Sequence, residues 1–324
     1  MAVYTEVSPE ALDEMMQTYD LPAITSIKGI AEGIQNSNYL LDTQHDRYIL
    51  TLYERGVSGV STDELPFYLN LMQHLSGKGV ICPTPVARRD GGLLSEVADR
   101  PAALVTFLKG LSVRTPKPHH CAELGAAIAK LHLAGQDFPM TRKNELSIDS
   151  WQGLFSANAD GASTIVPGME IEISNELERL NRNWPKDLPY GIIHADLFPD
   201  NVFFLDQKLS GIIDFYFACN DFFAYDLAIC LNAWCFEADV SFNLTKSRAL
   251  LDGYQSVRPL TAQEVDALPL LCAGAAMRFL LTRLHDWLHR VPGALVTPKN
   301  PADYLRRLRF HKNTSVPSDY GIGL

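Results

Sequence analysis

The sequence lacks the cysteine spacing of a disulfide framework or of a structural zinc site. Its six cysteines are scattered along the chain, and none of them stands in a C-x-x-C pair. Paired or clustered cysteines are the usual signature of secreted disulfide-bonded domains and of zinc sites, so the sequence argues against both and a reducing cytoplasm is expected.

A long apolar run and an amino-terminal signal are also missing. The longest weakly charged run, Ala267–Met277, is 11 residues long and too short to span a bilayer. The amino terminus is acidic and does not have the basic-then-apolar layout of a signal peptide. We therefore expect no membrane partner.

Positive charge is scarce. The chain has 28 Lys and Arg against 38 Asp and Glu, a net charge of −10. Proteins that hold nucleic acid usually carry a basic excess, so no nucleic-acid partner is expected. A nucleotide ligand stays open, because a metal ion can neutralise its phosphates locally. The apolar share of 47% is that of an ordinary globular protein.

Strand patterns dominate the first third of the chain. Ser8 followed by Pro9 predicts a helix start, and Thr62–Ser76 has helical periodicity. Runs typical of strands are Ile24–Ile30, Asn38–Asp42, Arg47–Tyr53, Val86–Arg88, Leu93–Val97 and Ala102–Phe107. The short polar turns between the first three runs predict an antiparallel meander.

Helical patterns dominate the remainder. The predicted helices are Pro118–Leu133, Trp151–Phe155, Ile171–Trp184 and most of the chain from Phe222 onward. A loop is expected at Ala157–Gly168, a strand–loop–strand unit at Gly191–Asp214, and a solvated helix or tail at Tyr304–Lys312. The pattern predicts an α+β protein with a small antiparallel β-rich lobe, residues 1–108, and a larger, mainly helical lobe, residues 109–324.

The strongest chemical signal is the run H-A-D-L-F-P-D-N from His194 to Asn201. It has the form H-x-D-x-x-x-x-N, with apolar runs on both sides, and Asp214 follows Asn201 by 13 residues. Phosphoryl transfer needs this inventory: one carboxylate to orient the acceptor hydroxyl, and an amide oxygen with a second carboxylate to hold Mg²⁺. For His194 we expect a structural role as a brace of this loop, and for Asp226 a structural role as an N-terminal cap or as a brace of the loop.

With this loop the chain resembles the aminoglycoside phosphotransferase/choline kinase-like family, which has the bilobal protein-kinase-like fold. The resemblance extends over roughly residues 24–288. It includes the Gly- and Asn-rich segment 29–39, the phrase T-L-Y-E at 51–54 and the phrase I-D-F-Y-F-A at 213–218. The last two phrases are most similar to the bacterial homoserine kinases.

The resemblance implies a role for each polar residue of the motif. Asp196 would be the catalytic base, and Asn201 with Asp214 would hold Mg²⁺. For binding ATP it implies Gly33, Asn36, Ser37 and Asn38 over the phosphates. It also implies that the backbone carbonyl of Thr106 and the backbone amide of Leu108 recognise adenine.

Two further features concern charge. Kinases of this fold usually have a Lys on the third strand, where this chain has Thr51; Arg55 and Lys109 are possible substitutes. Arg278 and Arg283 lie in an apolar helical run and need partners, because unpaired buried charge is costly. Either could bind the carboxylate of an amino-acid substrate, or an acid of the protein itself.

The resemblance implies an enzyme that uses ATP and Mg²⁺ to phosphorylate the hydroxyl of L-homoserine in threonine biosynthesis. A kinase for another small hydroxylated amine, such as choline, hydroxylysine or an aminoglycoside, is an alternative. A non-catalytic nucleotide-binding regulator is a second alternative, supported only by Thr51. The expected partners are ATP and the small-molecule acceptor, and the expected state is a monomer or homodimer.

Overall fold

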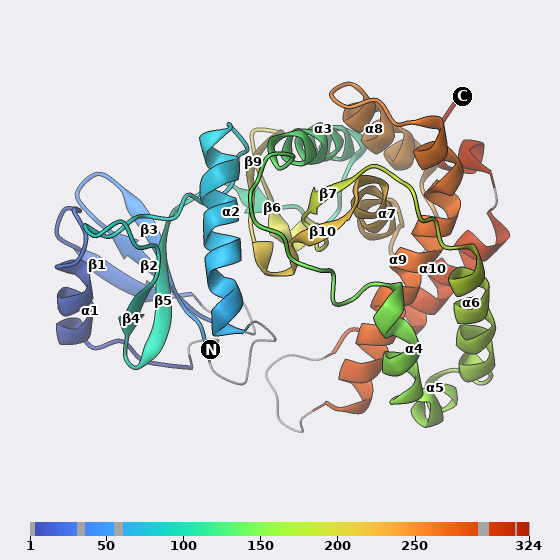
Figure 1. The fold of residues 1–324 in the computed structure, drawn as a ribbon, viewed down its shortest axis with the longest axis horizontal. Coiled ribbons are helices and arrows are strands. Elements are labelled where there is room, and N and C mark those ends of the chain that lie inside the picture. Colours follow the sequence, from blue (N-terminus) through green and yellow to red (C-terminus); the bar gives the residue numbers. More distant parts are fainter. Residues whose placement is uncertain (1–3, 31–35, 55–60, 291–297, 315, 324) are drawn as a thin grey trace. The chain divides into compact units, whose positions relative to one another are not determined.

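The computed structural model describes residues 4–30, 36–54, 61–290, 298–314 and 316–323 (Figure 1). The chain divides into two compact units. The first consists of Met1–Gly110 and Ser210–Tyr216, and the second of Leu111–Leu209 and Phe217–Leu324. The assignment of nucleotide binding to residues 1–108 and of catalysis to residues 109–324 stays a prediction.

An antiparallel sheet forms the centre of the first unit. Its strands lie in the order β1-β2-β3-β5-β4, and all neighbouring pairs are antiparallel. The bounds are Ser26–Gly29 for β1, Ser37–Asp42 for β2, Arg47–Leu52 for β3, Ser95–Val97 for β4 and Arg100–Thr106 for β5. The predicted meander is confirmed.

One predicted strand of this unit is wrong. Val86–Arg88 forms no strand, and only an isolated bridge joins Pro85 to Val105. Pro83 and Pro85 have no N–H to donate, so a regular ladder cannot form through this segment.

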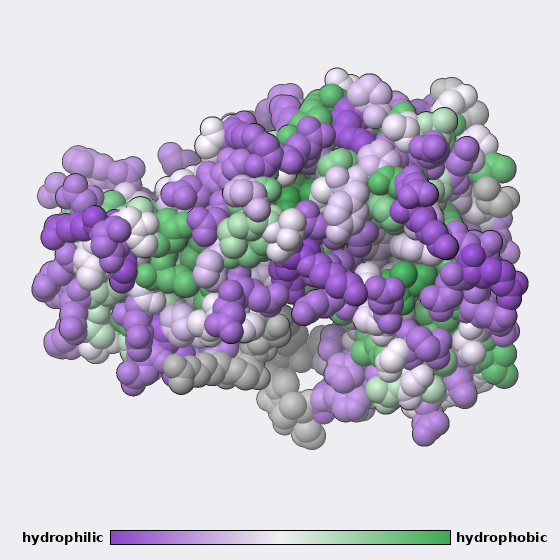
Figure 2. Space-filling view, viewed as in Figure 1, coloured by the Kyte–Doolittle hydropathy of each residue, from purple (hydrophilic) through white to green (hydrophobic). Residues whose placement is uncertain are grey.

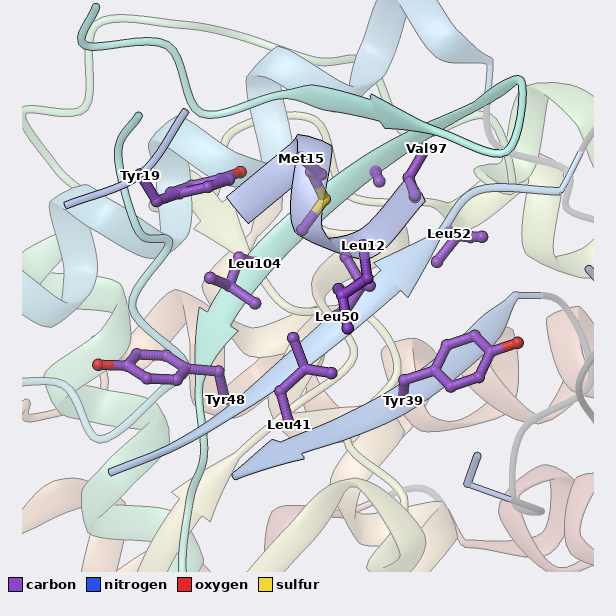
Figure 3. Packing of buried hydrophobic residues seen from close by; sticks show 11 residues of the cluster. Leu12, Met15, Tyr19, Tyr39, Leu41, Tyr48, Leu50, Leu52, Val97 and Leu104 are labelled. Carbon is purple, nitrogen blue, oxygen red and sulfur yellow. The ribbon is translucent and has the colours of Figure 1, made fainter. Parts of the chain in front are cut away.

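Two helices accompany the sheet. Helix α1, Pro9–Met16, begins as predicted, with the Ser8 hydroxyl accepting from the Ala11 N–H at 3.1 Å. Figure 3 shows its Leu12 beside the sheet residues Leu50 and Leu41, in the buried hydrophobic cluster of this unit. Helix α2, Leu65–Gly77, lies on the other side of the sheet (Figure 1).

The second unit is mainly helical. Its helices are α3 Pro118–Ala134, α4 Ile148–Ser156, α5 Ala159–Ile165, α6 Met169–Asn183, α7 Phe223–Trp234, α8 Leu244–Gln255, α9 Ala262–Leu288 and α10 Ala302–Asn313. Short strands accompany them: β6 Leu111–Ser112, β7 Tyr190–Ile193, β8 Val202–Leu205, β9 Lys208–Ile212 and β10 Cys219–Phe222. β7 pairs antiparallel with β10, and β6 pairs antiparallel with β8. Ser210–Ile212 of β9 belong to the first unit.

Two expectations for this unit are wrong. The predicted loop at Ala157–Gly168 contains helix α5, in which Gly161 packs closely: a Cβ there would lie 2.5 Å from the Leu288 side chain, which would have to shift. Residues Tyr304–Lys312 are helical, but only one face is solvated, because α10 buries Tyr304 and Leu308 on the other. Its arginines made the segment look like a surface helix.

Helix α9 is the single helix among the described residues that is long and apolar enough to cross a membrane. Of its most apolar window, 72% is buried inside the protein, as in a core helix. On the face shown in Figure 2, hydrophobic residues are scattered in small groups among polar ones.

Helices α3 and α8 pack unusually closely through two glycines. A Cβ on Gly253 would lie 2.2 Å from the Ala122 carbonyl oxygen, and a Cβ on Gly125 would lie 2.0 Å from the Leu250 carbonyl oxygen. Both obstacles are backbone atoms, which cannot rotate away. Even one additional methyl group would therefore force the two helices apart.

We predict that Gly253→Ala lowers the free energy of unfolding by about 1–3 kcal/mol, the usual cost of overpacking a core. Urea unfolding followed by circular dichroism measures it. Gly153→Ala in α4 is the matched control, because a Cβ there meets nothing within 4 Å. That helical substitution should be neutral or stabilising. A Gly253→Ala protein as stable as the control would contradict the close packing.

Candidate active site

Asp196 and Asn201 lie together in a loop of the second unit, between β7 and β8. The buried strand residues Ile193 and Val202 fix the two ends of the loop, and a 3₁₀ turn at Pro199–Asn201 folds it back. The Asn201 Nδ2 donates to the Asp196 backbone carbonyl at 2.8 Å and to its Oδ2 at 3.2 Å. The expected proximity of these two side chains is thus present.

The atoms left available suit the expected chemistry. Because the amide nitrogen of Asn201 binds Asp196, its Oδ1 is the atom that can ligate a cation. Both side chains are half-buried, so a small molecule can reach them. A carboxylate beside an amide oxygen offers hard oxygen ligands of the kind that Mg²⁺ prefers.

The backbone directly before Asp196 has a left-handed conformation. Ala195 has φ +63°, which is uncommon for a residue with a Cβ and costs about 1–2 kcal/mol. The His194 N–H donates to Oδ2 of Asp226 at 3.0 Å, and the Ala195 N–H donates to Oδ1 at 2.8 Å. The Arg278 Nη1 donates to the Ala195 carbonyl at 2.6 Å. One carboxylate and one guanidinium therefore hold this turn.

Three contacts fix other parts of the loop. The Trp234 indole N–H donates to the Leu197 carbonyl at 2.7 Å. Phe198 packs edge-on against Phe279 of α9, with ring centroids 4.9 Å apart. The Asp196 N–H donates to Nδ1 of the buried His194 at 3.3 Å, which confirms the structural role expected for that histidine.

Asp226 is fully buried on α7, and His132 of α3 contacts it at 3.1 Å. Burial acts to raise the pKa of Asp226, but the hydrogen bonds from His132 and the His194 N–H outweigh it and hold the pKa below its ordinary value. Burial lowers the pKa of His132. We therefore assign a neutral His132 that donates from Nε2 to an ionised Asp226.

A chain of hydrogen bonds continues from His132 across three helices. Its Nδ1 accepts from the Tyr254 hydroxyl of α8 at 2.8 Å. Arg258 donates to the same hydroxyl at 3.1 Å and to the buried Glu264 of α9 at 3.0 Å. These contacts confirm a brace role for Asp226. The extension of the hydrogen-bond chain through Tyr254 and Arg258 was not predicted, since no local sequence pattern links α3 to α8.

Asp214 belongs to the first unit and also has a left-handed backbone, with φ +67°. The residue as a whole is half-buried. Burial raises the pKa of Asp214, and the Tyr216 N–H acts against this by donating to the carboxylate. Asp214 is thus a second fixed oxygen donor in an unusual backbone conformation.

The predicted phosphate-binding segment is described from Asn36 onward, and Gly33 lies outside the described residues. The Ser37 hydroxyl donates to Glu54 at 2.5 Å and accepts from the N–H groups of Tyr4 and Thr5 at 2.8 and 3.1 Å. The Glu54 N–H donates to Asn36 Oδ1 at 3.4 Å. These side chains stabilise the start of β2, and their contact with phosphate stays a prediction.

Glu54 is an anchor that the predicted site residues did not include. Its carboxylate also accepts from Arg100 at 3.1 Å and from the Thr5 hydroxyl at 2.9 Å. The phrase T-L-Y-E contains Glu54, so a signal for it was present in the sequence.

Thr51, which replaces the usual lysine, donates its hydroxyl to Asn38 Oδ1 at 2.7 Å across the β2–β3 pair. Of the two possible substitutes, Arg55 lies outside the described residues and Lys109 is exposed. Glu64, the usual type of partner for that lysine, accepts from the Ser61 N–H at 3.4 Å in a capping box.

Thr106 and Leu108, which are predicted to recognise adenine, lie at and just beyond the end of β5. The Thr106 hydroxyl accepts from the Thr84 N–H at 2.9 Å. Leu108 packs against Gly211, where a Cβ would lie 2.8 Å from Leu108 Cδ1. Recognition of adenine by these residues stays a prediction.

The two predicted substrate arginines have different surroundings. Arg278 is buried and has a protein partner, the Ala195 carbonyl, so its contact with a substrate stays a prediction. Arg283 is half-buried and lies over the Tyr304 ring at 4.3 Å. Both belong to α9.

Known proteins of similar sequence cover the whole chain. The model of a phosphotransferase enzyme family matches residues 26–260. A homoserine kinase of Parvibaculum lavamentivorans is 58% identical over 322 residues, which is 99% of each chain. A homoserine kinase of Xanthobacter autotrophicus is also 58% identical, again over 99% of each chain.

Solved structures of similar fold are more distant in sequence. An amicoumacin kinase in complex with AMP-PNP, Ca²⁺ and Ami has a TM-score of 0.70 at 15% identity, over 96% of each chain. A spectinomycin phosphotransferase in complex with ADP and spectinomycin has a TM-score of 0.68 at 12% identity, over 98% of this chain and 99% of that one. These confirm the predicted α+β fold. Together with the match to the family model and the full-length relatives, they show that the chain belongs to the phosphotransferase enzyme family, in the group of homoserine kinases.

Proposed function

We propose that this chain transfers the γ-phosphoryl group of ATP to the hydroxyl of L-homoserine, giving O-phospho-L-homoserine and ADP. The observation that carries the proposal is the Asp196–Asn201 pair on a turn held by Asp226 and Arg278. Full-length relatives with 58% identity that are named homoserine kinases support the acceptor.

In this proposal Asp196 orients the acceptor. The homoserine hydroxyl donates to its carboxylate, and the hydroxyl oxygen attacks the γ-phosphorus in line with the bond to ADP. That bond breaks as the new phosphorus–oxygen bond forms, and Asp196 receives the hydroxyl proton. Catalysis then comes mainly from positioning and from stabilisation of charge.

Magnesium ligation is part of the proposal. The Oδ1 of Asn201 and the carboxylate of Asp214 are oxygen donors that suit Mg²⁺, and they would hold it. The ion would neutralise charge on the phosphates. This contribution also offers an explanation for an uncharged Thr51 in place of the usual lysine.

We propose that ATP is bound through the segment that includes Gly33, Asn36, Ser37 and Asn38, and through Thr106 and Leu108. The Ser37 hydroxyl is saturated by Glu54 and by two N–H groups. Contacts from Ser37 to phosphate would therefore come from its backbone.

We further propose that the enzyme acts in the cytoplasm, as a monomer or homodimer, in threonine biosynthesis. The described cysteines support this compartment: all six are free and buried.

The first prediction from the proposed function concerns the acceptor. MgATP and L-homoserine should give rapid ADP release, whereas choline, hydroxylysine and kanamycin should leave the rate at its value without acceptor. A coupled assay for ADP measures this, and an excess of EDTA should abolish the stimulated rate. Stimulation by another acceptor alone would overturn homoserine as the substrate, and ATP binding without stimulation by any acceptor would favour a regulator.

The second prediction concerns Asp196. Asp196→Asn removes the proton acceptor but keeps the size of the side chain, so kcat should fall by about 10²–10⁴-fold. Asp200→Asn is the matched control, since Asp200 lies in the same loop and is exposed. Near-normal turnover by Asp196→Asn would refute its role.

The third prediction concerns Asp226. An asparagine there offers one oxygen where two N–H groups and His132 now donate, so the turn loses support. We expect kcat to fall at least 10-fold and the free energy of unfolding to fall by about 3 kcal/mol, as when one partner of a buried charged pair is removed. Steady-state kinetics and urea unfolding measure both effects. Asp252→Asn, exposed on α8, is the control. Wild-type kinetics in Asp226→Asn would contradict the bracing role.

A further inference from the structure

Helices α9 and α10 place two arginines around one buried tyrosine. They lie side by side in the second unit (Figure 1). The guanidinium carbon of Arg283 lies 4.3 Å from the centre of the Tyr304 ring, and that of Arg307 lies 4.5 Å from it. Tyr304 itself has no exposed surface, whereas both arginines are half-buried. Two positive charges thus stand close to one aromatic ring.

Neither arginine has an acidic partner at ion-pair distance within the described residues. The Arg307 Nη1 donates to the Asn232 carbonyl at 2.7 Å. The Arg307 Nε is buried and has no hydrogen-bond partner at ordinary geometry among the described residues. The Tyr304 hydroxyl is buried beside the Arg307 side chain, which acts on it through a hydrogen bond. Unsatisfied polar atoms of this kind are costly in a folded protein unless a ligand completes them.

The other arginines of α10 are paired. Arg306 contacts Asp303 at 2.7 Å, and Arg309 contacts Glu172 at 2.5 Å. Both of these are exposed at the surface. The exposed arginines of the helix therefore have acidic partners, whereas the half-buried Arg307 has none at ion-pair distance among the described residues. A purely structural role would favour an acidic partner for the half-buried arginine.

The cluster lies within electrostatic reach of the catalytic loop. The charges of Asp303 and, more weakly, Asp196 act on Arg283, and that of Asp196 also acts on Tyr304. Burial is the largest influence on the pKa of each, lowering that of Arg283 and raising that of Tyr304. Arg283 stays protonated at neutral pH, as arginines in proteins do. One helix thus carries Arg278, which holds the Ala195 carbonyl, and Arg283, which lies over the neighbouring ring.

We propose that Arg283 and Arg307 bind the carboxylate of the amino-acid acceptor. The inference rests on the proposed function and names its specificity residues. A guanidinium group can donate two parallel hydrogen bonds to the two oxygens of a carboxylate. A short amino acid held here by its carboxylate would present its hydroxyl toward Asp196.

The arrangement predicts rejection of amino alcohols without a carboxylate. Such a compound would leave the two guanidiniums without a carboxylate, and sites with unpaired polar groups reject analogues strongly. The informative probe is 3-aminopropan-1-ol, which is homoserine without its carboxylate.

The test compares kcat/KM for L-homoserine and for 3-aminopropan-1-ol in Arg283→Gln, Arg307→Gln and the wild type. Each variant should lose about 10- to 100-fold with L-homoserine, mainly through KM, as expected for a lost hydrogen bond to a charged group. The values for 3-aminopropan-1-ol and the KM for ATP should stay unchanged. Arg306→Gln, which removes an exposed arginine of the same helix, should match the wild type throughout.

Calorimetric binding of L-2-aminobutyrate, which has the carboxylate but no hydroxyl, gives a readout independent of turnover. Its Kd should rise by a similar factor in both variants and stay constant in Arg306→Gln. An equal loss with both acceptors, or an unchanged Kd, would overturn the carboxylate site, and a raised KM for ATP would assign the arginines to the nucleotide instead. A wild-type enzyme inactive with L-homoserine would refute the proposed function itself, which separates the two failures.

Discussion

The carboxylate of Asp226 is the group on which the catalytic loop depends. The chain leaves β7 with two consecutive N–H groups that no strand partner satisfies, and both donate to this carboxylate. The bonds permit the left-handed conformation at Ala195, which in turn sets the direction of Asp196. A buried carboxylate without such donors would be strongly unfavourable. The two N–H groups therefore stabilise the Asp226 carboxylate, and the carboxylate in turn stabilises the backbone turn.

The close packing of α3 and α8 serves the same loop. Gly253 lets the two helix backbones approach, and the next residue, Tyr254, then reaches His132 at 2.8 Å. Because His132 is held from this side, it presents Nε2 to Asp226. A packing feature far from the reacting atoms thus helps to fix the orientation of the loop that carries Asp196.

Local sequence patterns predicted the loop well because its geometry is local. The H-A-D-L-F-P-D-N run and its apolar flanks indicated two short strands that place polar groups at their ends. The structure has these strands and joins Asp196 to Asn201 by a hydrogen bond. The meander of the first unit followed from turn residues and alternation. The family resemblance, rather than composition, predicted the homoserine kinase group.

What the sequence could not predict depends on contacts between distant segments. Helix α5 was expected to be a loop, because its Gly- and Ala-rich sequence gives no sign that Gly161 packs against Leu288. Helix α10 was expected to be solvated, because its three arginines conceal the face that buries Tyr304. The pairing of Arg283 with Arg307 around that ring joins two helices and has no local signature.

The most direct test of the central claim is the identity of the product. Proton-coupled phosphorus NMR of the compound formed from MgATP and L-homoserine should show one new phosphate resonance split into a triplet by the two protons of the terminal methylene group. That splitting locates the phosphoryl group on the hydroxyl that Asp196 is proposed to orient. An unsplit resonance would indicate an acyl phosphate on the carboxylate. That result, or free phosphate alone, would contradict the account.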